Sequence, residues 1–153
     1  LGVLAAIAII SFRKYVQHSK TTEAYTMLGD IRAKQEAYRA EFSQYCPVNA
    51  SLSSGLRHPG TAPRADGKKV AWDPAPNNWQ QLGVRPDGNV YLGYVTTAGI
   101  PPAACAGEDC PPVDVRDHWW VGRAYADLDG NGVMSSYTML SGARGVIILN
   151  EGE

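Results

Sequence analysis

The sequence predicts an α+β protein in which one long, protruding N-terminal helix packs on a four-stranded antiparallel sheet. Three observations predict this fold. All ten prolines and fourteen of the sixteen glycines follow Tyr45, so the first 45 residues contain few helix breakers. The remainder alternates turn-forming residues with short β-branched and aromatic runs, as strands do. A length of 153 residues suits one domain, and a net charge of −1 argues against bulk electrostatic binding of nucleic acid.

The predicted helix begins with an apolar run. Residues 1–10 carry no charge, and Arg13 and Lys14 are the first charged side chains. Ten apolar residues are about half of a membrane span, and the run has neither the basic start nor the cleavage site of a secretory signal. We therefore expect residues 1–10 to be the second half of a hydrophobic helix whose beginning precedes Leu1. A buried core helix is the alternative interpretation.

The helix then becomes amphipathic. Apolar residues recur at steps of three, four or seven and form one face, which Gln35 interrupts. The opposite face carries mixed charges, Glu23 among them, which we expect to be solvated. Pro47 cannot continue a helix, so we expect an N-terminal helix over residues 1–45, roughly 65–70 Å long. Its protruding half is residues 1–20, and its amphipathic half, residues 21–45, lies in the head. The apolar face consists of Ala24, Leu28, Ile31, Tyr38, Phe42 and Tyr45.

The rest of the chain, residues 46–153, is expected to form a globular, β-rich head. It begins with a long connection over residues 46–88, the αβ-loop, which is rich in Pro and Asp-Gly turns and which we expect Trp72 and Trp79 to anchor. The apolar face of the helix would cover one face of the sheet. Four strand candidates follow as a meander, at residues 89–96, 117–126, 133–140 and 145–149.

The pair Trp119-Trp120 lies on the second strand candidate. Because successive side chains of a strand point to opposite faces, we expect one ring in the core and the other at a subunit contact or a ligand surface. The three histidines lie in unrelated contexts, and no phosphate loop, nucleophile elbow or HExxH motif occurs. We therefore expect a protein that is not an enzyme, with no catalytic residues.

Three cysteines leave at least one thiol unpaired. Cys105 and Cys110 enclose four residues, so a local disulfide between them is the preferred pairing in an oxidising compartment. Pairing of Cys46 with either of the other two remains an alternative, because the sequence alone allows three single bridges.

The run DLDGNGVMS at residues 127–135 matches the first half of a calcium-binding loop, with oxygen ligands at alternate positions and a glycine at the sharp turn. The closing glutamate is missing, and Thr138 stands in its place, so this is not an EF-hand. A hairpin turn held by local hydrogen bonds is the alternative interpretation. No cofactor is required, and calcium is the one candidate. Its candidate ligands are Asp127, Asp129, Asn131, the Val133 carbonyl and Ser135.

The N-terminal region resembles the helix of type IV pilins and pseudopilins. The resemblance lies in the run LGVLAAIAI at residues 1–9, followed by Phe12, a basic pair and the run KTTEA at residues 20–24. It implies a type IV pilin-like fold, and a mature chain that starts about a dozen residues before Leu1 with a methylated residue. The family often has a proline where this sequence has Ile10. Calcium sites occur in the major pseudopilins of type II secretion.

The resemblance implies a structural subunit that polymerises through its hydrophobic helix into an extracellular filament on the surface of a bacterium. Its partners would be further copies of itself in a helical homopolymer, the inner membrane before assembly, and the pilus assembly machinery. A minor pilin or type II secretion pseudopilin is the first alternative, and a membrane-anchored calcium- or ligand-binding module is the second. The sequence leaves adhesion, motility, DNA uptake and electron transfer open as outputs. The expected filament or membrane contacts are Leu1, Val3, Leu4, Ile7, Ile9, Ile10, Phe12, Arg13 and Lys14.

Overall fold

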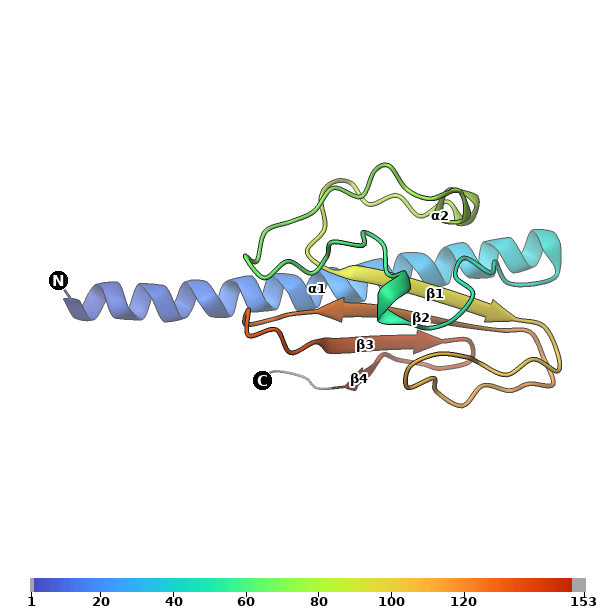
Figure 1. Ribbon diagram of the computed structural model, residues 1–153. Helices are drawn as coiled ribbons and strands as arrows, with labels where there is room; N and C mark the ends of the chain where they lie inside the picture. Colours follow the sequence, from blue (N-terminus) through green and yellow to red (C-terminus); the bar gives the residue numbers. More distant parts are fainter. Residues whose placement is uncertain (1, 150–153) are drawn as a thin grey trace.

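The computed structural model describes residues 2–149, without the side chains of residues 2–6 and 149. One long helix, α1 (Gly2–Phe42), is followed by a short 3-10 turn, a six-residue helix α2 (Asn77–Leu82) and four strands (Figure 1). The α+β class is therefore confirmed. The strands are β1 (Gly93–Gly99), β2 (Trp119–Ala126), β3 (Ser135–Leu140) and β4 (Ile147–Leu149).

The four strands form one antiparallel sheet in the order β1-β2-β3-β4, as the predicted meander requires. The first strand begins at Gly93, four residues later than predicted, and ends at Gly99. Val90 instead forms an isolated antiparallel bridge with Val70 of the αβ-loop. The shift has a tertiary cause, because the backbone amides of Tyr91 and Leu92 donate hydrogen bonds to a helix carboxylate and leave the ladder.

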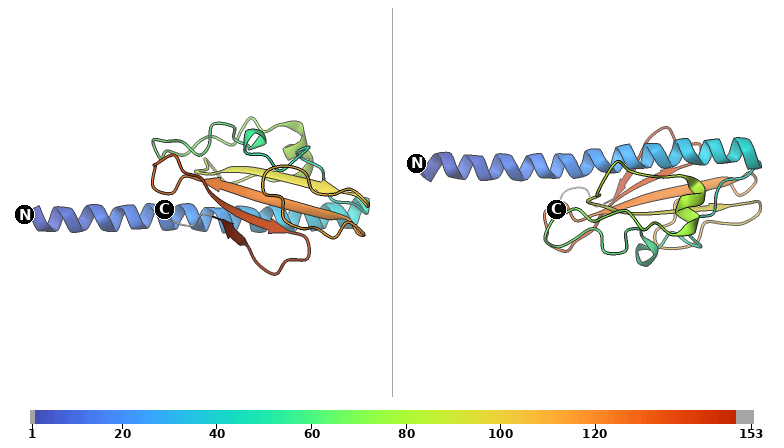
Figure 2. Two further views of the ribbon diagram at one scale, coloured as in Figure 1. Left: turned by 60° about the horizontal axis from the view of Figure 1, so that its bottom comes forward. Right: turned by 90° about the horizontal axis from the view of Figure 1, so that it is seen from above.

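The second half of α1 packs along one face of the sheet, and the first part extends beyond it (Figures 1 and 2). Gly122 of β2 lies under Leu28 and Ile31, and a Cβ atom at this position would meet both side chains at 3.5 Å. The nearest neighbour of such an atom would be the Trp120 ring, at 3.1 Å, so a side chain at position 122 would crowd this ring. The main core contains, among others, Ala24, Met27, Leu28, Ile31, Tyr94, Trp120, Ala124, Tyr137 and Met139.

The other face of the sheet is also buried, a second layer that the sequence pattern does not predict. Every residue of β2 is buried, and the connection between β1 and β2, residues 100–118, runs beside the sheet on this side. Trp119 and Trp120 are both buried, in the outer and main clusters respectively, so the prediction of one outward-facing ring was wrong. The outer cluster is defined by Leu52, Val95, Trp119, Val121 and Tyr125.

The helix ends at Phe42, three residues before the expected Tyr45. Ser43 adopts a left-handed conformation with φ of 59°, and its amide donates to the Arg39 carbonyl oxygen at 2.8 Å, which closes the last turn. Tyr45 and Cys46 then turn back into the core. Pro47 is therefore not what stops the helix, because the chain has already reversed direction.

The αβ-loop packs through its aromatic residues, as predicted. Trp72 and Trp79 are buried and meet edge to face, with ring centroids 5.2 Å apart. His58 packs against Trp72, and its Nε2 atom lies 2.7 Å from the Trp72 carbonyl oxygen. Burial lowers the pKa of His58, so this imidazole is neutral at pH 7. Helix α2, which carries Trp79, was not predicted because six residues are too few to show a helical period.

Candidate functional site

The N-terminal part of α1 presents large apolar side chains to solvent. We call residues 7–15 the exposed segment; within it Ile7 is 57% exposed and Tyr15 is 71% exposed. At about 100° per residue, its apolar side chains point around the whole circumference of the helix. A helix that is apolar on all sides is stable only when other molecules surround it. These side chains are Ile7, Ile9, Ile10, Phe12 and Tyr15.

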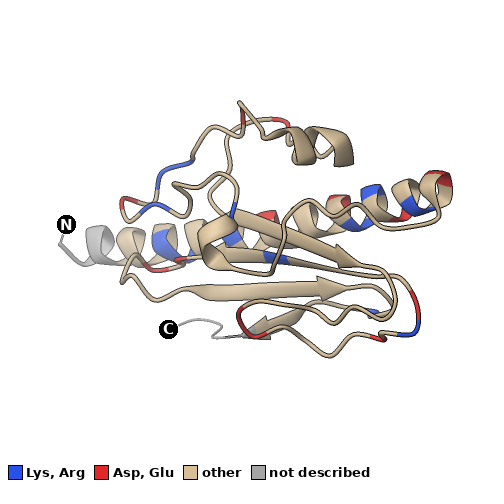
Figure 3. Cartoon of the chain, turned by 45° about the vertical axis from the view of Figure 1, so that its right-hand side comes forward, with Lys and Arg blue, Asp and Glu red and all other residues tan. Residues whose placement is uncertain are grey.

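Most of the predicted contact residues lie on the exposed segment. Leu1 lies outside the described residues, and only the backbone of Val3 and Leu4 is described. Arg13 and Lys14 are exposed, and in Figure 3 the coloured part of α1 begins with uncharged residues before the first Lys or Arg. The structure thus places the contact residues from Val3 to Lys14 on one continuous helix, with the basic pair at the end nearer the head.

The head begins earlier on the helix than the sequence indicated. Lys20, assigned to the protruding half, is only 6% exposed. Its ammonium group donates to the carbonyl oxygens of Asp127 at 2.8 Å and Leu128 at 3.2 Å. The side chain therefore holds the β2–β3 hairpin against the point where α1 leaves the head, and residue 20 belongs to the head.

Glu23 was expected on the solvated face and is instead half-buried. Its carboxylate accepts hydrogen bonds from the backbone amides of Tyr91 and Leu92 and from the Tyr94 hydroxyl, at 2.8–3.1 Å. Burial raises the pKa of Glu23, and these hydrogen bonds together with the charge of Lys69 act in the opposite direction. The carboxylate positions the entry to β1 against α1.

Gln35, the one interruption of the apolar face, is fully buried. Its amide nitrogen donates to the Cys46 carbonyl oxygen at 3.0 Å, and its amide oxygen accepts from the Cys46 backbone amide at 2.8 Å. The side chain thus acts as a strand-like partner for the returning chain. In the sequence, Lys20, Glu23 and Gln35 are distinguished only as polar residues on or near the apolar face of the helix. This position alone does not predict their hydrogen-bond partners.

A groove lies beside the root of the exposed segment. It is lined by α1 residues from Tyr15 to Asp30, by Lys69 and by residues 85–90, with a volume of about 850 Å³. Its walls carry both signs of charge, including Asp30, Lys69 and Arg85. The groove is open and mixed in polarity.

The candidate calcium loop forms the β2–β3 hairpin turn. The Asp127 carboxylate accepts hydrogen bonds from the amides of Gly130 at 2.8 Å and Gly132 at 3.1 Å. The carboxylate of Asp129 accepts from the Asn131 amide, and the Asn131 side chain accepts from the Val133 amide.

These contacts give the acidic side chains and the glycine amides of the turn local partners. Gly130 and Gly132 have φ of 82° and 86°, values that favour glycine. Beside the turn, the Lys20 ammonium already occupies the Asp127 carbonyl oxygen. Within the described residues, no group of three or more His, Cys, Asp or Glu side chains could hold a metal ion. The described geometry is that of a hairpin turn held by local hydrogen bonds, and calcium binding stays a prediction.

The disulfide in the structure is the pairing preferred from the sequence. Cys105 and Cys110 form a disulfide, and Cys46 is a buried free thiol. Burial raises the pKa of the Cys46 thiol to about 11, so it is protonated at pH 7.

Comparison of the chain with models of protein families, with curated proteins and with solved structures finds no match. In the part of the chain that the structure describes, no helix has both the length and the apolar character needed to cross a membrane.

Proposed function

We propose that this protein is a structural subunit of a type IV pilus-like filament, in which α1 is the polymerisation element and the head forms the outer surface. The observation that carries the proposal is the exposed segment, whose apolar side chains face all directions and are more than half exposed to solvent. Burying such a surface is favourable by about 25 cal/mol per Å² of apolar area.

A filament core supplies the surroundings that this segment lacks. Helices of neighbouring copies can contact it on every side, whereas a closed two-fold dimer would cover only one stripe. The head supports the same arrangement, because its own apolar clusters are buried within the fold. Polymerisation through α1 therefore leaves the fold of the head unchanged. Before assembly, the same helix would be stored in the inner membrane, with Arg13 and Lys14 at the headgroups on the side of the head.

The test is a charge placed in the exposed segment. Ile7→Asp and Ile10→Asp are each expected to abolish filaments, because a carboxylate buried in an apolar core costs several kcal/mol per subunit. The matched control is Ile100→Asp, which makes the same substitution at a head residue of equal exposure, 55% against 57% and 58%. The control should retain filaments.

Electron microscopy of filaments sheared from the source cells, with antibody detection of this chain, reads out the result. Filaments of unchanged yield in both helix variants would contradict the proposal. A uniform filament built of another subunit, with this chain at its tip, would instead identify a minor pilin. A monodisperse protein that stays in the membrane would favour the anchored module.

A further inference from the structure

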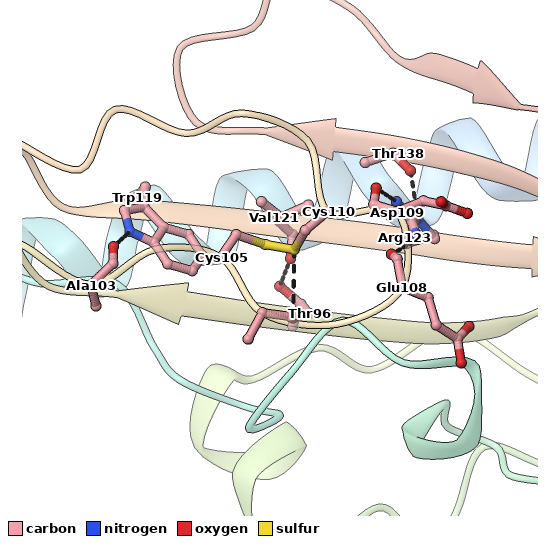
Figure 4. The surroundings of a disulfide bond; sticks show 11 residues. Thr96, Ala103, Cys105, Glu108, Asp109, Cys110, Trp119, Val121, Arg123 and Thr138 are labelled. Atoms are coloured by element: carbon pink, nitrogen blue, oxygen red, sulfur yellow. Dashed lines mark hydrogen bonds between the residues drawn. A yellow bond between two sulfur atoms is a disulfide. The ribbon is translucent and has the colours of Figure 1, made fainter.

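The disulfide closes a short ring against the outer face of the sheet. We call residues 105–110 the cystine ring (Figure 4). Cys105 and Cys110 are partly buried and pack on the outer cluster, whereas residues 106–109 are exposed. Beside the ring, the Trp119 indole nitrogen donates to the Ala103 carbonyl oxygen at 2.8 Å. The ring is therefore part of the cover over an apolar cluster.

The ring also binds the start of the αβ-loop. The Leu52 amide donates to the Ala106 carbonyl oxygen, and the Glu108 amide donates to the Leu52 carbonyl oxygen, both at 2.8 Å. Gly107 lies so close to the Leu52 backbone that a Cβ atom would collide with it. The Glu108 carboxylate accepts further bonds from Ser54.

Beneath the ring lies a buried cation. Arg123 of β2 is 2% exposed, and its guanidinium donates to the carbonyl oxygens of Glu108 and Asp109, both at 2.7 Å (Figure 4). Its third partner is the Thr138 hydroxyl at 2.8 Å. Among the described residues, no carboxylate lies within ion-pair distance of this guanidinium. Two carbonyl groups of the ring thus take the place of the water molecules that a guanidinium loses on burial.

The conformation that presents these carbonyl groups is not one that an open chain favours. Asp109 has φ of 45° and Gly107 has φ of 120°. A positive φ is uncommon for an aspartate, so ring closure helps to keep the backbone in this arrangement. Once the ring is open, ordering its exposed residues costs conformational entropy that few buried contacts offset.

We propose that the cystine ring is a redox-sensitive latch that covers the outer face of the sheet. A dithiol reductant opens it in two steps. One thiolate of the reductant attacks a ring sulfur and forms a mixed disulfide, releasing the other cysteine. The second thiolate then displaces the protein sulfur, leaving two protein thiols and an oxidised reductant, with two electrons and two protons transferred to the protein.

Opening the latch withdraws the two carbonyl groups from Arg123 and exposes the cluster around Trp119. The main core is unaffected, because α1 covers the opposite face of the sheet. Cys46 takes no part in the exchange, because its thiol is fully buried and a thiol must ionise to react.

The test is amide hydrogen exchange of the full chain before and after treatment with dithiothreitol. Reduction is expected to accelerate exchange of the Leu52 and Glu108 amides at least tenfold. Core amides such as those of Leu28 and Ile31 should stay unchanged. Alkylation and mass measurement verify that two thiols formed. Unchanged protection at Leu52 and Glu108 after verified reduction overturns the proposal, and so does a bridge that resists millimolar dithiothreitol.

Variants separate this bridge from other effects of the reductant. The double variant Cys105→Ser/Cys110→Ser should show the fast exchange with or without dithiothreitol. Cys46→Ser should respond to dithiothreitol as the wild type does. If the Cys46→Ser variant no longer responds, the effect of dithiothreitol depends on Cys46 and the proposal is overturned. If the double variant does not fold, reduction of the folded wild type still decides the question.

Discussion

Three polar side chains on α1 act as hydrogen-bond partners for the backbone of the head. Lys20 binds two carbonyl groups of the β2–β3 hairpin, Glu23 binds amides at the entry to β1, and Gln35 binds both backbone groups of Cys46. Each satisfies groups that the fold withdraws from water. The helix is thus fixed to the head by polar contacts at three positions along its length, in addition to its apolar face.

Replacing Gln35 tests the innermost of these contacts. Gln35→Leu should lower the free energy of unfolding by about 1–3 kcal/mol, because the Cys46 amide would be buried without a partner and its carbonyl would keep only the bond from the Val48 amide. Chemical denaturation of the full chain measures the loss. Gln44→Leu, at an exposed position, should change stability by less than about 0.5 kcal/mol. Equal effects of the two substitutions would contradict this role for Gln35.

Replacing Glu23 tests the effect of burial on a carboxylate. Because the pKa of Glu23 is raised in the folded state, the native protein binds more protons than the unfolded chain just above pH 4.5. Stability due to this group should therefore fall as pH rises from its ordinary pKa to its raised value, and then level off. Glu23→Gln should remove that fall, since one oxygen, Oε1, accepts bonds from all three donors.

Urea denaturation between pH 4 and pH 8 measures this slope. Glu41→Gln, which removes the same charge at an exposed site, is the control and should retain the wild-type slope. A Glu23→Gln variant whose stability declines with pH as steeply as that of the wild type would rule out the carboxylate as the source.

At the scale of elements, the β2–β3 hairpin is fixed from two sides. Its own turn is closed by the Asp127 carboxylate, which binds the amides of Gly130 and Gly132. The Lys20 ammonium fastens the start of the same turn to α1. The hairpin therefore has its structural partners within the chain.

This arrangement predicts how the hairpin responds to substitution and to calcium. Asp127→Ala should lower the free energy of unfolding by about 1–3 kcal/mol, because two amides lose a shared acceptor. The loss should be the same in chelator and in millimolar calcium, measured by thermal melting. A wild-type melting temperature that rises by several degrees in calcium would show a bound ion and support the calcium interpretation.

The two long connections of the head are stabilised by different contacts. The αβ-loop is packed by indole rings from its own sequence, whereas residues 100–118 depend on a disulfide and on Arg123. Aromatic packing can be anticipated from isolated tryptophans in a polar segment. The role of Arg123 cannot, because an arginine on a strand is usually expected at the surface.

At the scale of the whole molecule, the chain consists of a self-contained head and a helix that extends from it (Figure 2). The exposed segment makes no contribution to the apolar clusters of the head. The two parts should therefore be separable, provided that the division respects Lys20.

Truncation tests this division. A chain of residues 15–153 should fold and melt within a few degrees of the full protein. A chain of residues 21–153 loses the Lys20 contacts and should be about 1–3 kcal/mol less stable, with roughly 2–4 °C lost per kcal/mol. Circular dichroism melts compare the two. Failure of residues 15–153 to fold would contradict the two-part architecture.

Local sequence patterns determined the long helix, the four strands and the hairpin turn. Helix breakers are few before Tyr45, β-branched and aromatic runs mark the strands, and Asp-Gly and Asn-Gly mark the turn. These patterns depend on contacts between residues close in sequence. The apolar beginning of α1 was equally visible, because an apolar segment needs no partner within the chain in order to be recognised.

Only the tertiary structure decided the helix end at Phe42, the burial of Trp119 and the roles of Lys20, Glu23, Gln35 and Arg123. Each depends on residues that are distant in sequence but meet in space, such as Lys20 with Asp127 and Arg123 with Glu108. A polar side chain carries no local sign that its partner is a buried backbone group. Burial, not periodicity, gives these side chains their function.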